Sequence, residues 1–259
     1  ADYTYTYADV DKDDKVLNLA TSSDIPTLDL SKATDQQSFQ TANTTMEGLT
    51  RVDAEGKVQP GVAESWETSE DGLTWTFKLR KNSTWSNGTP VTAHDFEYSW
   101  KRTLTPETAS EYSYIMADIV GSSTKEIEAN GVDGVGVKAL DDYTLEVKLN
   151  RPVAYFAELV SFQVFFPQNQ AFVESCGDAY GSAADKQLYN GPFTLTSWKM
   201  EDQFTMEKNP NYWDAANVKL NKINTKVVKD TGAEVSLYED GQIDRAILSS
   251  DYVDKYKDS

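Results

Sequence analysis

Hydrophobic and polar residues alternate strictly between residues 73 and 79. The side chains of a β-strand point to opposite faces with a period of two, so this pattern predicts a strand with one buried face. Residues 143–149 show the same alternation and predict a second strand of this kind. The apolar positions are Leu73, Trp75, Phe77 and Leu79 in the first segment and Tyr143, Leu145, Val147 and Leu149 in the second.

A capped helix is predicted after the turn at residues 86–90, whose sequence is Ser-Asn-Gly-Thr-Pro. Thr92 is expected to be the N-cap, with Asp95 at the third helical position of a capping box. Pro106 is expected to stop the helix. Its apolar stripe, spaced at i, i+4 and i+8, consists of Phe96, Trp100 and Leu104.

Shorter patterns of the same kinds predict the remaining elements. Gly48 is expected near the C-cap of one of the helices, and Thr231 is expected to cap another. Strands are predicted at residues 15–20, 135–139, 193–198, 203–208, 222–229 and 243–247. Helices are predicted at residues 38–49, 151–160, 169–176 and 231–239.

Composition narrows the possible functions. The 259 residues are enough for a sizeable core, and 39% of them are hydrophobic. The formal net charge of −18 argues against nucleic acid as a partner, because phosphates are bound by Lys and Arg. It argues equally against an anionic membrane surface. No stretch of the sequence approaches the length of a transmembrane helix.

Residues with catalytic or metal-binding potential are scarce. The single histidine, His94, has no catalytic triad to join, and the single cysteine, Cys176, cannot form an internal disulfide. The sequence contains no zinc-type cluster, P-loop or dinucleotide fingerprint. We therefore expect a non-enzymatic protein with no metal and no cofactor. The sequence has no initiator Met and no signal peptide, so we expect a processed or engineered start.

Five segments together resemble one protein family. The most distinctive is residues 75–102, WTFKLRKNSTWSNGTPVTAHDFEYSWKR. The others are residues 48–75, 137–144 (VKALDDYT), 190–193 (NGPF) and 209–213 (NPNYW). Taken in their order along the chain, these segments resemble the family-5 extracellular solute-binding proteins, the oligopeptide and dipeptide receptors of ABC importers. The likeness covers nearly the whole chain, and within the family it is nearest to the oligopeptide-binding proteins.

The resemblance implies an α/β fold of the periplasmic-binding-protein-like kind (type II, cluster C). A first lobe with a mixed sheet would be formed by residues 1–45 and 162–247, and a smaller α+β domain, residues 46–161, would be inserted in it. Residues 248–259 would begin a second lobe. Family members are much longer than this chain, so we expect an N-terminal portion in which the second lobe is missing.

The same resemblance implies a function. Oligopeptides would be captured in a cleft between two lobes that close by hinge motion, and then delivered to ABC permease subunits. We expect a monomeric, extracellular protein, tethered by a lipid to a Gram-positive cell surface, or alternatively a periplasmic one. The family's lipid-bearing N-terminal Cys is absent, so such an anchor would have been removed before Ala1.

A receptor for many peptides does well to bind their common backbone as an added β-strand. The resemblance implies that Thr34, Asp35 and Gln36 supply one edge for that strand, although an ordinary loop capping a helix explains the same residues. It implies that Tyr112 lines the cleft, although a partly buried core tyrosine is the alternative. The opposite edge belongs to the second lobe, so we expect weak peptide binding or none. The remaining implied ligand contacts are Phe162, Gln163, Asn190 and Gly191.

Other functions stay open at this point. Relatives in the family carry dipeptides, pheromones, haem, nickel or oligosaccharides. A nickel site would need more histidine than the chain has, and a sugar site would need aromatic side chains facing the cleft. An acidic secreted hydrolase is a further alternative, because the abundant carboxylates could include the catalytic pair of a glycosidase. A surface adhesin is another.

Overall fold

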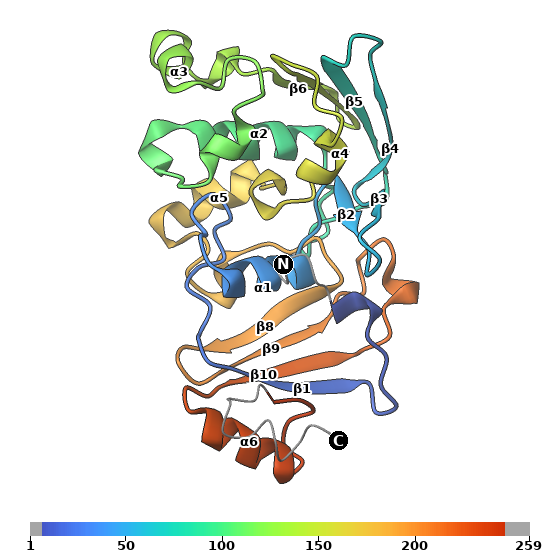
Figure 1. Cartoon of the computed structure of the whole chain (residues 1–259), viewed down its shortest axis with the longest axis vertical. Helices are drawn as coiled ribbons and strands as arrows, with labels where there is room; N and C mark the ends of the chain where they lie inside the picture. The colour runs from blue at the N-terminus through green and yellow to red at the C-terminus, as the bar shows by residue number, and fades with distance from the viewer. Residues whose placement is uncertain (1–6, 247–259) are drawn as a thin grey trace.

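The computed structural model describes residues 7–246. Its two main sheets lie at opposite ends of an elongated molecule, with helices between and beside them (Figure 1). The predicted start of the second lobe, residues 248–259, lies outside the described residues, as does Ile247.

The lower sheet in Figure 1 is mixed and has the strand order β1-β10-β9-β8. Its first pair, β1 with β10, is parallel, and the other two pairs are antiparallel. Helix α1 (Gln36–Thr45) packs on β8, and α6 (Thr231–Glu239) lies beyond β1 at the lower end. The strands are β1 (Val16–Thr21), β8 (Phe193–Lys199), β9 (Gln203–Lys208) and β10 (Lys222–Val227).

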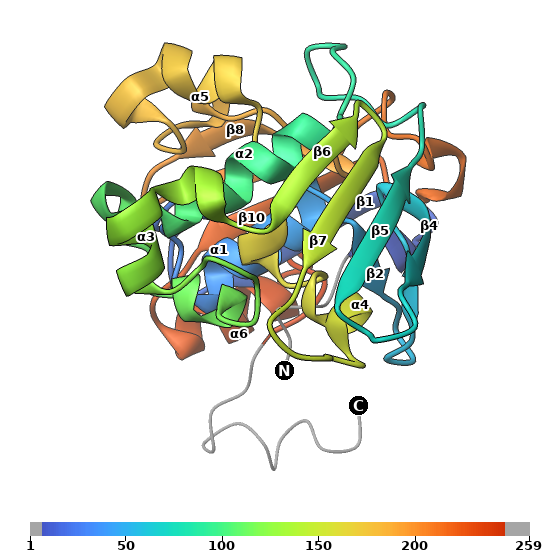
Figure 2. The same ribbon diagram turned by 90° about the horizontal axis from the view of Figure 1, so that it is seen from above.

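The upper sheet is antiparallel throughout, with the order β4-β5-β7-β6. Figure 2 shows its four strands side by side, with α2 (Ala93–Leu104) beside β6. The strands are β4 (Ala63–Thr68), β5 (Thr74–Leu79), β6 (Val137–Asp141) and β7 (Thr144–Lys148). The smaller elements are the hairpin β2 (Thr50–Val52) and β3 (Val58–Pro60), and the helices α3 (Thr124–Asn130), α4 (Phe156–Leu159) and α5 (Gln170–Cys176).

Each sheet has its own hydrophobic core. The mixed-sheet core combines residues from β1, α1, β8, β9 and β10, such as Leu19, Phe39 and Phe193. The antiparallel-sheet core combines the apolar face of β4–β7 with the stripe of α2 and the segment before α5, such as Phe77 and Trp100. Partly buried rings of two residues, Tyr112 and Phe162, pack against both cores. The division into domains at residues 45/46 and 161/162 stays a prediction.

The capping box of α2 is present as predicted. The Thr92 backbone N–H donates to the Asp95 carboxylate at 3.0 Å, and Trp85 Nε1 donates to the same oxygen at 3.1 Å. Burial raises the pKa of Asp95 to about 6, against the opposing effect of these two hydrogen bonds. The predicted stripe of α2 is buried in the antiparallel-sheet core.

Several predicted boundaries are wrong for local reasons. Helix α1 begins at Gln36 because the Asp35 carboxylate accepts from the Ser38 backbone N–H, and it ends at Thr45 rather than at residue 49. Gly48 is not a C-cap. The N-cap of α6 is Asp230 rather than Thr231, and α4 is much shorter than the predicted helix at 151–160. Residues 243–246 form no strand.

Candidate functional site

One exposed residue, Thr34, precedes the N-cap of α1. The N-cap, Asp35, has extended dihedral angles (φ −118°, ψ 159°) before the helix begins. Within the described part of the chain, the Thr34 N–H has no hydrogen-bond partner, and its carbonyl oxygen accepts from the Tyr112 hydroxyl at 3.4 Å. A backbone amide left open to solvent is available to a ligand.

A row of four aromatic rings lies beside this backbone, formed by Phe39, Phe162, Tyr112 and Tyr114. The rings of Phe39 and Phe162 have centroids 5.2 Å apart, and Tyr112 lies 5.6 Å from Phe39 and 5.9 Å from Phe162. The Tyr114 ring lies 6.0 Å from that of Tyr112. The row comes from α1 and from two irregular segments, so three distant parts of the sequence build it.

Three of the predicted site residues therefore lie together: Thr34, Tyr112 and Phe162. Gln163 is adjacent in sequence but fully buried, and its Nε2 donates to Asn43 Oδ1 at 2.9 Å. The ligand-binding role of all these residues stays a prediction.

Other predicted site residues have structural contacts of their own, and their ligand-binding role stays a prediction. The Asp35 carboxylate caps α1, and Gln36 is the first helical residue, so the predicted extended edge ends at residue 35. Asn190 is buried and exchanges two hydrogen bonds of 3.0 Å with the backbone N–H and C=O of Glu47. A Cβ on Gly191 would lie 2.5 Å from the Met46 nitrogen, so only glycine fits there. Asn190 and Gly191 lie at this packed crossing and not in the aromatic row.

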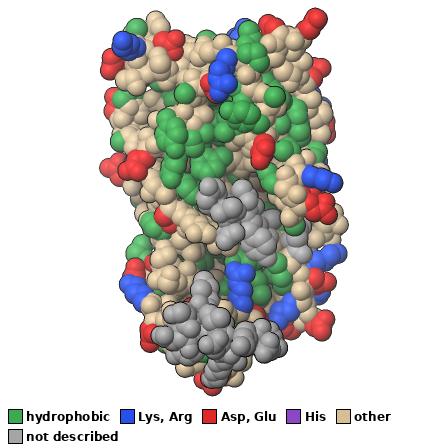
Figure 3. All heavy atoms as spheres, viewed as in Figure 1, with side chains coloured by type: hydrophobic (Ala, Val, Ile, Leu, Met, Phe, Trp, Pro, Cys, Tyr) green, Lys and Arg blue, Asp and Glu red, His purple; other side chains and the backbone are tan. Residues whose placement is uncertain are grey.

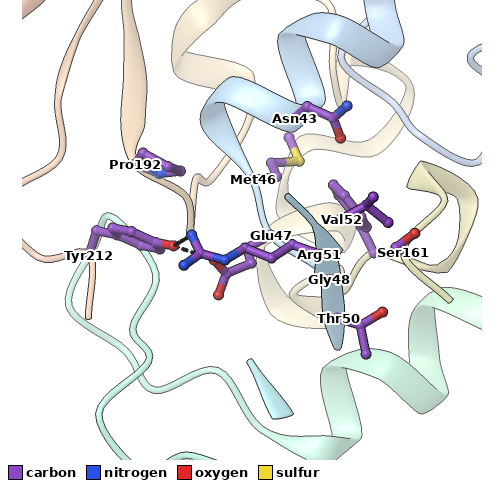
Figure 4. Close-up of a pocket in the computed structure, with 11 residues that line it drawn as sticks. Asn43, Met46, Glu47, Gly48, Thr50, Arg51, Val52, Ser161, Pro192 and Tyr212 are labelled. Atoms are coloured by element: carbon purple, nitrogen blue, oxygen red, sulfur yellow. Dashed lines mark hydrogen bonds between the residues drawn. The ribbon is translucent and has the colours of Figure 1, made fainter. Parts of the chain in front are cut away.

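The Glu47 carboxylate lies beside a small hollow between the two cores (Figure 4). The Tyr212 hydroxyl donates to its Oε2, and Trp213 Nε1 donates to its Oε1 at 2.7 Å. Two arginines lie close to the Trp213 ring. The Arg80 guanidinium is 3.5 Å from the ring centroid, and that of Arg51 is 5.9 Å from it. The hollow measures about 40 Å³, which has room for water but not for a peptide.

Glu47, Tyr212 and Trp213 form a buried polar junction, and burial is the main influence on the pKa values of its ionisable groups. Burial raises the pKa of Glu47, although the hydrogen bonds from Tyr212 and Trp213 and the nearby arginines act in the opposite direction. Burial and the adjacent carboxylate also raise the pKa of the Tyr212 hydroxyl, so it stays a neutral donor.

The sequence pattern gave no role to Phe39, Asn43, Tyr114 or Glu47. Only Glu47 has a partial signal, since it directly precedes the family-like block at residues 48–75 and its partner Tyr212 belongs to the block at residues 209–213. What is missing from sequence alone is the pairing, because Glu47 and Tyr212 are 165 positions apart. In residues 7–246, the structure contains no group of three or more His, Cys, Asp or Glu placed to hold a metal ion. No helix in the same range is long and apolar enough to span a membrane.

Comparisons with known proteins agree with this architecture. A chain of the oligopeptide ABC transporter substrate-binding domain from Bacillus anthracis superposes with a TM-score of 0.93 at 47% identity, over 95% of this chain and 47% of that one. The Listeria monocytogenes protein described as OppA bound to peptide superposes with a TM-score of 0.92 at 42% identity, over 95% and 48%. The predicted periplasmic-binding-protein-like fold class is confirmed.

Curated relatives lead to the same group. The oligopeptide-binding protein OppA of Bacillus subtilis is 41% identical over 214 residues, which are 83% of this chain and 39% of that protein. The dipeptide-binding protein of Lactococcus lactis is 38% identical over 240 residues, 91% of this chain and 44% of that protein. The chain thus spans less than half the length of these relatives.

A family model provides the remaining evidence. Residues 57–259 match the model described as "Bacterial extracellular solute-binding proteins, family 5 Middle". This match covers most of the chain and includes the antiparallel sheet, α2 and the NPNYW segment. The chain belongs to the family-5 bacterial extracellular solute-binding proteins.

Proposed function

We propose that this chain forms one side of a binding site for oligopeptides in a substrate-binding protein of an ABC importer. The observation that carries the proposal is the exposed Thr34 backbone, with an unpaired N–H and a carbonyl that accepts only from Tyr112 in the described residues. A peptide that pairs with this backbone as an added strand is held by main-chain hydrogen bonds, which are the same for every sequence.

The aromatic row supports the proposal. Tyr112 lies beside the open backbone, to which its hydroxyl donates, and its ring packs against those of Phe162 and of Phe39 on α1. Side chains of a bound strand would project alternately, so one set would face these rings. Relatives described as oligopeptide-binding and as bound to peptide share the fold that builds this arrangement.

The second half of the site would come from the part of the relatives that this chain does not match. A backbone paired on one edge only gains few contacts, and association also costs translational and rotational freedom. We therefore expect weak binding by this chain, with dissociation constants of about 1 mM, which corresponds to about −4 kcal/mol.

The test is a titration of the ¹⁵N-labelled chain with unmodified pentapeptides, observed by NMR. The Thr34 amide signal is expected to shift with saturation. Thr34→Pro, which removes the N–H, is expected to abolish the shift of the neighbouring signals, whereas Thr34→Ala, which keeps it, is expected to bind as before. Circular dichroism would confirm that both variants fold.

The contrary result is equally clear. Equal binding by the proline and alanine variants would remove the Thr34 edge from the site. A chain whose spectrum no peptide changes, at concentrations above 10 mM and thus well beyond the expected value of about 1 mM, would overturn the proposed function. The same titration with dipeptides, sugars and nickel would then decide among the other solutes of the family.

Finer aspects belong to the same proposal. We propose delivery to ABC permease subunits, a monomeric state, no catalytic activity, and lipid tethering to a Gram-positive cell surface or location in a periplasm. The family description as extracellular and the periplasmic relatives support the location outside the cytoplasm. We also propose the domain division at residues 45/46 and 161/162, which the separate cores support.

A further inference from the structure

Tyr114 is the most exposed large hydrophobic residue in the described part of the chain, with 67% of its surface accessible. It lies in a short 3-10 turn, Ser113–Met116, where the neighbouring Met116 is buried. Hydrophobic side chains gather on the upper half of the face seen in Figure 3, over the region where α2 and α4 lie in Figure 1. Exposed apolar surface of this kind commonly marks an interaction site.

Ring contacts connect Tyr114 to the candidate site. Its ring lies 6.0 Å from that of Tyr112 at an interplanar angle of 36°, and Tyr112 in turn contacts Phe39 and Phe162. The row therefore runs from the buried Phe39 to the exposed Tyr114. The Tyr112 hydroxyl, bonded to the Thr34 carbonyl, ties the row to the open backbone.

The exposed end is aromatic, and the nearest charged residue in the sequence is the exposed Glu111, directly before Tyr112. Residues 112–116 read Tyr-Ser-Tyr-Ile-Met and contain no ionisable group except the two phenols. A large apolar guest side chain gains by removing area from water, and an aromatic one gains a further ring contact. A carboxylate would find no cation in this segment. An ammonium gains less, because a cation over an exposed ring keeps most of its hydration.

We propose that Tyr114 is a specificity-determining residue, which favours peptides that carry an aromatic or large apolar side chain beside the residue paired with Thr34. This inference rests on the proposed function and adds a side-chain preference to it. Tyr112 forms the inner part of the same surface, but its ring is already packed against both cores, so the exposed Tyr114 ring provides the area that a ligand can still cover.

The test compares pentapeptides that are identical except for the central residue: Ala, Leu, Phe, Lys or Glu. Affinities are measured from NMR shifts of the ¹⁵N-labelled chain. We expect the Phe peptide to bind about threefold to tenfold more tightly than the Ala peptide, with Leu between them. Tyr114→Ala is expected to bring the Phe-to-Ala ratio close to one while the Ala peptide binds as before, and Tyr114→Phe is expected to keep the preference.

A matched control comes from Tyr155, which is 54% exposed and has its hydroxyl 3.5 Å from Arg151. It makes no ring contact with the row, so Tyr155→Ala is expected to leave the preference unchanged. A Phe preference that survives Tyr114→Ala, or a Lys or Glu peptide that binds best, would overturn the inference while leaving the proposed function intact. If no peptide shifts the Thr34 amide, the proposed function itself fails.

Discussion

Two buried polar junctions connect the cores, and they differ in how their charges are balanced. In one, Arg102 on α2 forms two hydrogen bonds with the Asp29 carboxylate, at 2.7 and 2.8 Å, so a full positive charge meets a full negative one. In the other, the Glu47 carboxylate accepts from two neutral donors, Tyr212 and Trp213. Its arginines act at one remove: Arg80 lies over the Trp213 ring at 3.5 Å, and Arg51 donates to the Tyr212 hydroxyl at 3.3 Å.

The difference shows that a buried carboxylate can be stabilised in two ways. The Asp29–Arg102 pair is extended by Gln168, which accepts from Arg102 at 3.1 Å and donates to Ser31 at 2.8 Å. Burial alone would lower the pKa of Arg102, but its hydrogen bonds and attraction to Asp29 outweigh this and raise it. Within residues 7–246, Glu47 forms no direct ion pair of this kind, so its junction depends on hydrogen-bond geometry and should respond more to pH.

The largest effect is expected from removal of the arginine. Arg102→Met leaves Asp29 charged and only 3% exposed, so the free energy of unfolding should fall by about 3–5 kcal/mol. Urea unfolding followed by tryptophan fluorescence measures this loss. The control is the double variant Arg102→Met with Asp29→Asn, which leaves no buried charge and should be more stable than Arg102→Met alone. A double variant whose loss equals the sum of the single losses would show that the pair is not coupled.

A smaller loss is expected at the Glu47 junction. Tyr212→Phe removes one donor but keeps the ring, and the carboxylate still accepts from Trp213, so the expected loss is about 1–3 kcal/mol. The same urea experiment applies. Tyr189→Phe is a suitable comparison, because that hydroxyl donates to the Ala184 backbone carbonyl, an uncharged acceptor, and should cost less. Equal losses would mean that the charge of Glu47 adds nothing to the hydrogen bond.

The pH dependence separates the two junctions further. Because the pKa of Glu47 is raised on folding, the native chain binds more protons than the unfolded chain, and its stability should fall as pH rises from the unfolded value through the folded one. Glu47→Gln should flatten this part of the profile. The measurement is the free energy of unfolding at a series of pH values.

A second buried carboxyl must be separated from this effect. The pKa of Asp95 is raised to about 6, so it acts in the same direction, with stability lost between about pH 4 and pH 6 by up to about 3 kcal/mol. Asp95→Asn removes that part alone. The decisive comparison is between Asp95→Asn and the double variant that also carries Glu47→Gln. If both show the same dependence of the free energy of unfolding on pH, the native state does not raise the pKa of Glu47, and the two junctions do not differ in their response to pH.

Strands β5 and β7 and helix α2 were predictable because their signals are local, whereas the edge strand β4 was not predicted. Hydrophobic and polar residues alternate over seven positions in each strand segment, and this pattern follows directly from strand geometry. The N-cap Thr92 lies only three residues from its partner Asp95. Strands β5 and β7 and the start of α2 therefore agree with the sequence patterns. The fold class followed from several motifs in a fixed order. These features depend on neighbours within a few positions.

Sequence patterns fail where contacts between residues far apart in the sequence determine the local structure. Gly48 resembles a helix stop, but it lies in an extended segment that pairs with residues 61–63, and a Cβ there would come within 2.8 Å of Phe166. A distant contact also determines the surroundings of Asn190, whose side-chain amide pairs with the backbone of Glu47, 143 positions away, while its predicted ligand contact stays a prediction. Of the candidate site, Thr34, Tyr112 and Phe162 came from resemblance, whereas Tyr114 could be identified only from its exposure and ring contact in the structure.

The smallest effect on the free energy of unfolding is expected from Arg51, one of the two arginines beside the Trp213 ring. Arg51 has 36% of its side chain exposed, lies 3.4 Å from Asp214 and donates to the Tyr212 hydroxyl at 3.3 Å, so its ion pair is screened by solvent and its hydrogen bond is long. Arg51→Lys should therefore change the free energy of unfolding by no more than about 1 kcal/mol. The matched variant is Arg80→Lys, because that guanidinium lies over the Trp213 ring at 3.5 Å and its Nε donates to the Gly61 carbonyl at 2.6 Å. A planar guanidinium stacks and donates in a way that an ammonium cannot, so Arg80→Lys should cost more and depend less on salt. If both variants lose the same small amount, the indole contacts only the surface of the junction, and Glu47 is stabilised by its two neutral donors alone.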